Sequence, residues 1–241
     1  MAQAAPRGPG GAARSDTMAA PPGRRMTLMD ELRAEHDVIE RVAGAFLTFA
    51  ALPPPDRPPE DGAAFLRFFR HYAGHFHHAR EEDTLFVALR DRAGLRADRG
   101  PIATMIADHQ RMAGLLAEAG AALGGGAGGE DRLRAPATAY VHALWHHIDA
   151  ENSVLFPECE PRLRRNGVTE LPSRPMTADE RGARAAGEAL AARYPPPRDP
   201  DVIRGDGCIM CPAFGVTCRG LELEWWNEWE WDEFEDRMGG G

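Results

Sequence analysis

The chain contains no lysine, and all 28 of its basic residues are arginine. Its 37 acidic residues leave a formal net charge of −9, and no segment concentrates positive charge. Proteins that bind nucleic acids neutralise phosphates with a basic patch or stripe. The charge balance therefore argues against nucleic acid as a partner.

Long apolar runs and cysteine are also scarce. No run approaches the roughly 20 apolar residues that cross a bilayer, so no membrane interaction is expected. Residues 1–25 are rich in Ala, Pro, Gly and Arg and lack the apolar core of a secretory signal, so we expect a disordered N-terminal tail. Four cysteines in 241 residues do not make a disulfide scaffold, which favours a cytoplasmic protein.

Residues typical of β-strands are few and do not alternate with polar residues, so the expected fold class is all-α. Apolar residues instead recur every three or four positions, the pattern of an amphipathic helix. Four such segments, separated by proline- or glycine-rich turns, cover residues 27–52, 61–92, 101–123 and 131–165. Four long helices joined by short loops predict an antiparallel up-down four-helix bundle over residues 26–165.

After residue 165 the character of the sequence changes. Thr177 and Glu180 have the spacing of a capping box, so residues 166–194 are predicted to form a linker and a short fifth, amphipathic helix. Residues 195–241 begin with three prolines and continue into a segment rich in Cys, Trp and acidic residues. For them we expect a Pro-rich linker and an extended or disordered C-terminal tail.

The tail has two further features. Cys208 and Cys211 form a CxxC pair, with Cys218 close behind; a redox-active dithiol, an incomplete metal clip and a divergent tail without a role all remain open. Four of the five tryptophans lie among acidic residues in 223–234. Such a segment cannot bury itself, so we expect it to dock on the bundle or on a protein partner.

One chemical pattern occurs twice in the predicted bundle. His77 and His147 are each followed four residues later by a glutamate, Glu81 and Glu151, and then by a Leu-Phe pair. Side chains four positions apart lie on one face of a helix, about 6 Å from each other. An imidazole and a carboxylate at this spacing can bind one metal ion, or the carboxylate can bridge two.

Each of the four predicted helices also places a histidine on its apolar stripe. Carboxylates in a bundle core must be neutral or paired, so two inward glutamates among four histidines indicate a cation between them. Six nitrogen and oxygen ligands, two of them able to bridge, suit a pair of octahedral-type ions better than a closed tetrahedral zinc site. The predicted dinuclear site consists of His36, His77, Glu81, His109, His147 and Glu151.

The phase of the second helix leaves an alternative open. Rotation by one residue would turn His78 and Glu82 inward in place of His77 and Glu81, so both are alternative ligands. Three other histidines, His71, His75 and His142, are expected at the rim or the surface.

These residues resemble the hemerythrin-like family, also called HHE cation-binding domains, over about residues 26–165. The matching segments are Glu35-His36, His77–Phe86, Asp108-His109 and His146–Pro157. The resemblance implies an antiparallel four-helix bundle that holds two non-haem irons bridged by carboxylates. It also implies that Glu81 and Glu151 are the bridges and that the terminal ligands are His36, His77, His109 and His147.

One position departs from the family pattern. The oxygen-carrying members have a second histidine one turn after that of the third helix, where this chain has Ala113. Unless His78 supplies a fifth histidine, more coordination positions are open to water, oxygen, peroxide or nitric oxide. The resemblance therefore implies a di-iron protein that binds or responds to these small molecules, and it favours a metal- or gas-binding protein over an enzyme. The alternatives are a peroxidase-like di-iron oxidoreductase and a protein of iron sensing or iron–sulfur cluster repair.

Overall fold

The structure, a computed structural model, describes residues 26–124 and 132–196, together with Trp229. In this part of the chain all regular structure is helical and no β-strand occurs, which confirms the expected all-α class. The predicted N-terminal tail (1–25) and the Cys- and Trp-rich part of the C-terminal tail lie outside the described residues, except for Trp229. No described helix is long and apolar enough to cross a membrane.

The helices lie where the periodicity of the sequence predicts them. In chain order they are α1 (Thr27–Ala51), η1 (Pro54–Asp56), α2 (Pro59–Arg67), η2 (Phe68–His78), η3 (Glu81–Phe86), α3 (Val87–Ala93), α4 (Gly100–Gly124), α5 (Arg134–Ala150), η4 (Glu151–Leu155), α6 (Phe156–Arg165) and α7 (Ala178–Arg193). Elements η2, η3 and η4 are π-helices, and η1 is a short 3₁₀ helix.

Two of the predicted helices contain π-helical turns, and each continues through them as one uninterrupted helix. The residues that join α2 to η2 and η3 to α3 keep right-handed helical backbone angles, so these elements form one rod, the α2–α3 rod. It ends at Gly94, whose φ of 70° belongs to the left-handed region that glycine adopts without strain. In the same way α5, η4 and α6 form the α5–α6 rod.

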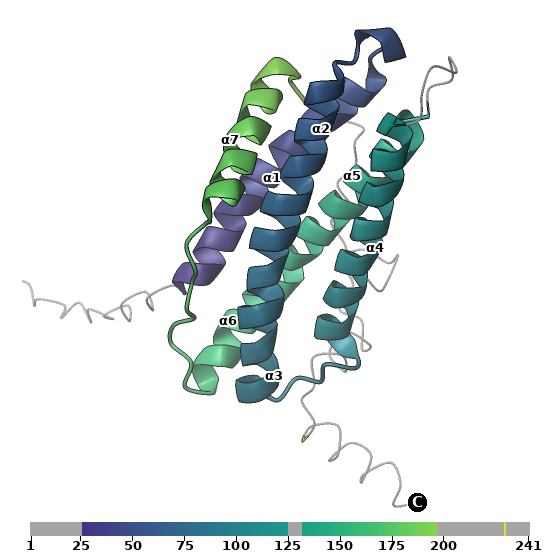
Figure 1. Cartoon of the computed structure of the whole chain (residues 1–241). Helices are drawn as coiled ribbons and strands as arrows, with labels where there is room; N and C mark the ends of the chain where they lie inside the picture. The colour runs from purple at the N-terminus through teal and green to yellow at the C-terminus, as the bar shows by residue number, and fades with distance from the viewer. Residues whose placement is uncertain (1–25, 125–131, 197–228, 230–241) are drawn as a thin grey trace, which may run out of the picture.

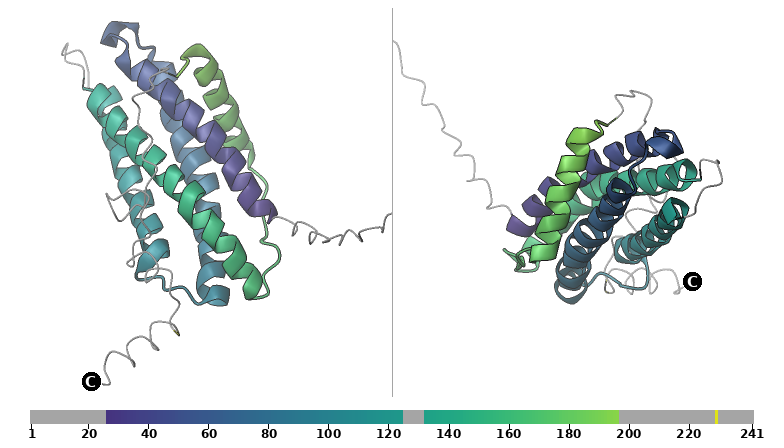
Figure 2. Two further views of the ribbon diagram at one scale, coloured as in Figure 1. Left: turned by 180° about the vertical axis from the view of Figure 1, so that it is seen from behind. Right: turned by 45° about the horizontal axis from the view of Figure 1, so that its top comes forward.

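Figure 1 shows α1, the α2–α3 rod, α4 and the α5–α6 rod side by side, and the two views of Figure 2 agree. Helix α7 packs against α1, α2 and η2 on one side of this group. It begins at the predicted capping box, in which Thr177 and Glu180 bond reciprocally. The approach to η2 is close, because a Cβ at Gly187 would overlap the ring of Phe68.

The apolar core is divided into two clusters. The first core cluster includes Phe46, Phe49, Phe65, Phe69 and Tyr140. The second core cluster includes Leu28, Leu32, Leu85, Phe86 and Phe156. Helices α1 and α4 are the other two rods of the group. Along all four rods the inward histidines and glutamates fall between the two clusters. The fold therefore presents a layer of buried polar side chains with apolar packing on both sides.

Candidate metal centre

All six residues of the predicted dinuclear site lie in this buried polar layer. His36, Glu81 and Glu151 have no solvent exposure, and the other three are at most 7% exposed. Each rod contributes at least one of them, because each carries its ligand-type residue at the same level between the two core clusters. The structure thus brings together side chains that are more than 100 positions apart in the sequence.

Four of these side chains form a first group that could hold one ion: His36, His77, Glu81 and Glu151. One possible ligand atom from each lies within 4.8 Å of every other. The Nε2 atom of His36 is 3.2 Å from Oε2 of Glu151. The Nε2 atom of His77 is 3.3 Å from Oε1 of Glu81.

A second group that could hold an ion consists of His78, Glu81, His109 and His147. The Nε2 atoms of His109 and His147 are 3.0 Å apart, and Nε2 of His109 is 3.5 Å from Oε2 of Glu81. Glu81 belongs to both groups and turns one oxygen to each. Glu151 belongs to the first group alone. Its other oxygen nevertheless lies 3.4 Å from Nε2 of His147, a member of the second group.

The atoms that converge on this centre are buried without hydrogen-bond partners in the described part of the chain. They are His36 Nε2, His77 Nε2, His78 Nε2 and both carboxylate oxygens of Glu81 and Glu151. A buried acceptor without a partner is costly, and seven in one place are far more than a stable core tolerates. The donor set therefore fits a pair of cations that accept these lone pairs.

The outward nitrogens of His36, His77 and His109 are hydrogen-bonded to polar neighbours. His36 Nδ1 lies 2.9 Å from the side-chain oxygen of Asn152, and His77 Nδ1 donates to Glu35 at 3.0 Å. His109 Nδ1 donates to Glu82 at 2.6 Å. His147 Nδ1 lies 3.8 Å from a carboxylate oxygen of Asp108, which is beyond hydrogen-bond distance. Partners of this kind orient an imidazole ring and leave its other nitrogen free to bind a metal.

A buried ion pair extends the contacts of His77. Arg80, which is 3% exposed, donates to Glu35 and also to Glu31. Ser173, in the linker before α7, donates to Glu31 at 2.5 Å and accepts from Arg80 at 3.2 Å. The linker thus reaches the side chains that orient His77.

The structure combines the two orientations predicted for the second helix: His77, His78 and Glu81 all face the centre. His77 faces the first group and His78 the second, while Glu81 points inward. Glu82 does not replace Glu81; it contacts His109 from the outer side. His77 and His78 are the last two residues of the π-helical η2, and Glu81 and Glu82 are the first two of η3, where the helix is more widely wound. Adjacent residues can therefore serve neighbouring ligand groups, which ideal α-helical phase does not predict.

The carboxylates and imidazoles of the centre shift one another's pKa values. Burial by itself would raise the pKa of Glu81, but His77 and His109 lower it to about 2. Burial also opposes charge on His109, yet the carboxylates of Glu81 and Glu82, one beside each of its ring nitrogens, raise its pKa to about 10. A cation that binds His109 Nε2 has to displace this proton, so metal affinity rises with pH.

The structure places the remaining histidines outside the centre. His75 and His142 are exposed and His71 is half-buried, in keeping with the expected positions of these three at the rim or surface. His146, for which no position was predicted, is also exposed. Cys159 is buried in the second core cluster, and burial raises the pKa of its thiol. The three cysteines of the tail lie outside the described residues, so the structure adds nothing to the three interpretations of that segment.

Four contributors to the centre were not assigned a role from the sequence: Glu35, Arg80, Asp108 and Asn152. Glu35 and Asp108 each directly precede a predicted ligand histidine, which is a usable signal. Each lies beside the histidine of another helix, because successive residues on a helix point in directions about 100° apart. Arg80 and Asn152 carry no local signal of this kind.

Comparison with known proteins agrees with this geometry. The family model described as the hemerythrin HHE cation-binding domain matches residues 26–159, more than half of the chain. No curated protein and no solved structure matches the chain. The matched range contains both histidine–glutamate pairs and both groups of candidate ligands. The chain therefore belongs to the hemerythrin HHE cation-binding domain family.

Proposed function

We propose that the protein binds two non-haem irons bridged by carboxylates. The observation that carries this proposal is the pair of four-residue groups that share Glu81 and surround seven buried, unpartnered nitrogen and oxygen atoms. The ligands are His36 and His77 for one ion, and His78, His109 and His147 for the other. Glu81 and Glu151 bridge the two ions.

Iron is favoured over zinc by the number and type of the donors. A structural zinc site takes four ligands in a tetrahedron and often includes thiolates. Both candidate groups contain only imidazole and carboxylate, and two of their members can bridge. Such donor sets suit octahedral-type ions, and family membership adds iron as the usual cation.

The fold assigned to this function is an antiparallel four-helix bundle with α7 as an addition. The support is the order of the core clusters along the chain. Helix α1 and α4 pass from the second core cluster to the first, whereas the α2–α3 and α5–α6 rods pass from the first to the second. Alternating directions put the ligand residues of all four rods at one level.

The centre binds or responds to oxygen, peroxide or nitric oxide in this proposal. Bound iron supplies an exchangeable coordination position and a change of oxidation state. The protein contributes orientation through the Nδ1 contacts and shields the centre with two apolar clusters. We assign it to the cytoplasm as a metal- and gas-binding protein, with the C-terminal tail as the contact for a protein partner. A peroxidase-like oxidoreductase uses the same residues and is the alternative.

Metal analysis tests the stoichiometry. Protein reconstituted anaerobically with ferrous iron is expected to hold two irons per chain, because two groups of donors share the Glu81 bridge. Optical spectra recorded before and after exposure to oxygen should show a new near-ultraviolet absorption of the bridged, oxidised pair. One tightly held zinc per chain with no uptake of iron would overturn the proposal.

A second test concerns His78. Its Nε2 is buried without a partner and lies in the second group of candidate ligands, so His78→Ala should lower the iron content of the loaded protein from two ions toward one. The matched control is His75→Ala on the same helix, whose side chain is exposed. Two irons retained in His78→Ala would show that the second ion is held by His109, His147 and the bridges alone.

A further inference from the structure

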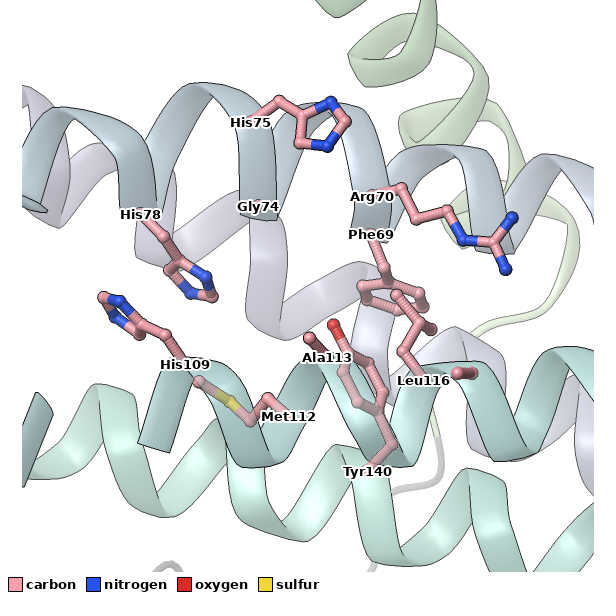
Figure 3. Close-up of a pocket in the computed structure, with 11 residues that line it drawn as sticks. Phe69, Arg70, Gly74, His75, His78, His109, Met112, Ala113, Leu116 and Tyr140 are labelled. Atoms are coloured by element: carbon pink, nitrogen blue, oxygen red, sulfur yellow. The ribbon is translucent and has the colours of Figure 1, made fainter. Parts of the chain in front are cut away.

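A cavity of about 240 Å³ lies beside the metal centre, between η2 and α4 (Figure 3). Its apolar walls are formed by Phe69, Met112, Ala113, Leu116 and Ala117. A cavity of about 150 Å³ is large enough for benzene, so this one holds a molecule of about ten non-hydrogen atoms by the same scale. Oxygen, peroxide and nitric oxide need far less space.

Small side chains keep the cavity open on both sides. Gly74 contributes no side chain on η2, and Ala113 contributes a single methyl group on α4. Ala113 is also the position where the oxygen-carrying relatives are expected to have a histidine. A large residue at either position would reduce the volume.

Tyr140 places an unpartnered hydroxyl in the cavity. The side chain is 2% exposed, and Figure 3 shows its oxygen directed between Phe69 and Ala113. No hydrogen-bond partner for this hydroxyl is found among the described residues. Burial raises its pKa, so the group remains a protonated donor. A buried donor of this kind calls for an acceptor on a ligand.

The two ends of the cavity differ in chemistry. His78 and His109 form the inner end, next to the metal centre, whereas the exposed guanidinium of Arg70 lies at the other end. No hydrogen bond or ion pair of Arg70 occurs in the described part of the chain. A guanidinium recognises a carboxylate through paired hydrogen bonds. The cavity thus joins a carboxylate site, apolar walls and a hydroxyl donor.

We propose that this cavity binds a small organic oxo-acid. Its carboxylate pairs with Arg70, its apolar body lies between Phe69, Met112 and Leu116, and its oxo group accepts a hydrogen bond from Tyr140. The apolar end then faces His78 and His109. The proposal goes beyond gas binding and does not depend on the identity of the metal, because none of the three contacts involves it.

The test is equilibrium dialysis of the full-length protein, as purified with its metal, against 4-oxo-4-phenylbutanoate. Apart from the carboxylate, which pairs with the exposed Arg70, this acid has ten non-hydrogen atoms and so matches the size of the cavity. We expect saturable binding of one molecule per chain, with a Kd at or below about 1 mM for a ligand of this size. 4-Phenylbutanoate, which lacks the oxo group, should bind at least threefold more weakly. The neutral amide of the oxo-acid should bind at least fivefold more weakly.

Variants assign the contacts. Arg70→Gln should weaken binding of the oxo-acid at least fivefold. Tyr140→Phe should abolish the difference in affinity between the oxo-acid and 4-phenylbutanoate. Ala113→Leu should remove binding of both acids by filling the cavity. The fold should tolerate this change because Ala113 is exposed on the cavity side. Ala117→Leu, at another wall position, repeats the test. Arg111→Gln and Ala121→Leu, on exposed positions of α4 outside the cavity, are the matched controls and should bind normally.

The opposite results would overturn the proposal. No saturable binding to the wild type, or unchanged binding to both Ala113→Leu and Ala117→Leu, would show that the cavity is not the site. Unchanged affinity in Arg70→Gln would show that the carboxylate binds elsewhere, for example at the metal. Since dialysis counts the bound acid, it remains decisive even if the chain holds no iron, so a failure here differs from a failure of the di-iron proposal.

Discussion

Glu81→Ala is expected to reduce the iron content of the reconstituted protein to less than about one tenth of the wild-type value. Glu81 belongs to both groups of candidate ligands, and its two oxygens face His77 and His109. Its removal deprives both ions of a shared anionic ligand at once. The measurement is iron per chain after gel filtration, and Glu151→Ala should behave in the same way.

His71→Ala is the matched control for this prediction. His71 lies on the same rod but outside both groups of candidate ligands, so its iron content should stay at the wild-type level. Glu81→Gln keeps the shape of the side chain and removes its charge. It should lose iron while its helical circular dichroism stays unchanged, which separates loss of the ligand from misfolding. A wild-type iron content in Glu81→Ala together with a loss of iron in His71→Ala would show that the α2–α3 rod turns His71, and not Glu81, toward the metal.

Arg80→Ala is expected to lower the free energy of unfolding by about 3–5 kcal/mol. Arg80 is 3% exposed and donates to Glu35, which is 7% exposed. Loss of the guanidinium leaves a buried carboxylate charge whose only remaining hydrogen-bond partner among the described residues is His77. The measurement is urea unfolding followed by circular dichroism, at a fixed and saturating iron concentration.

Two further variants identify the cause of this loss. Arg90→Ala removes an exposed arginine of the same rod, paired with Asp91 at the surface, and its stability should be unchanged within error. Glu35→Gln added to Arg80→Ala removes the stranded charge and should restore part of the stability. A stable Arg80→Ala protein would mean that water reaches Glu35, and that the ion pair does not support His77.

The helix positions could be predicted because they depend on local information. Apolar residues at three- and four-residue spacing place α1 and α4 within one residue of their observed ends, and the capping box marks the start of α7. The interior of the second rod could not be predicted in the same way. The π-helical turns η2 and η3 change which side chains face inward, and they depend on how the rod packs against its neighbours.

The sequence by itself determined the all-α class, the family resemblance and the six residues of the predicted centre, because donor type and four-residue spacing are properties of single helices. Only the tertiary structure decided that His77 and His78 both face inward and that Glu82 supports His109 from outside. It also decided which groups hold the outer nitrogens, since Asn152 and His36 are 116 positions apart and Glu35 and His77 are 42 apart. These contacts and the cavity beside Tyr140 arise where separate helices meet, and no local pattern encodes the distance between helices.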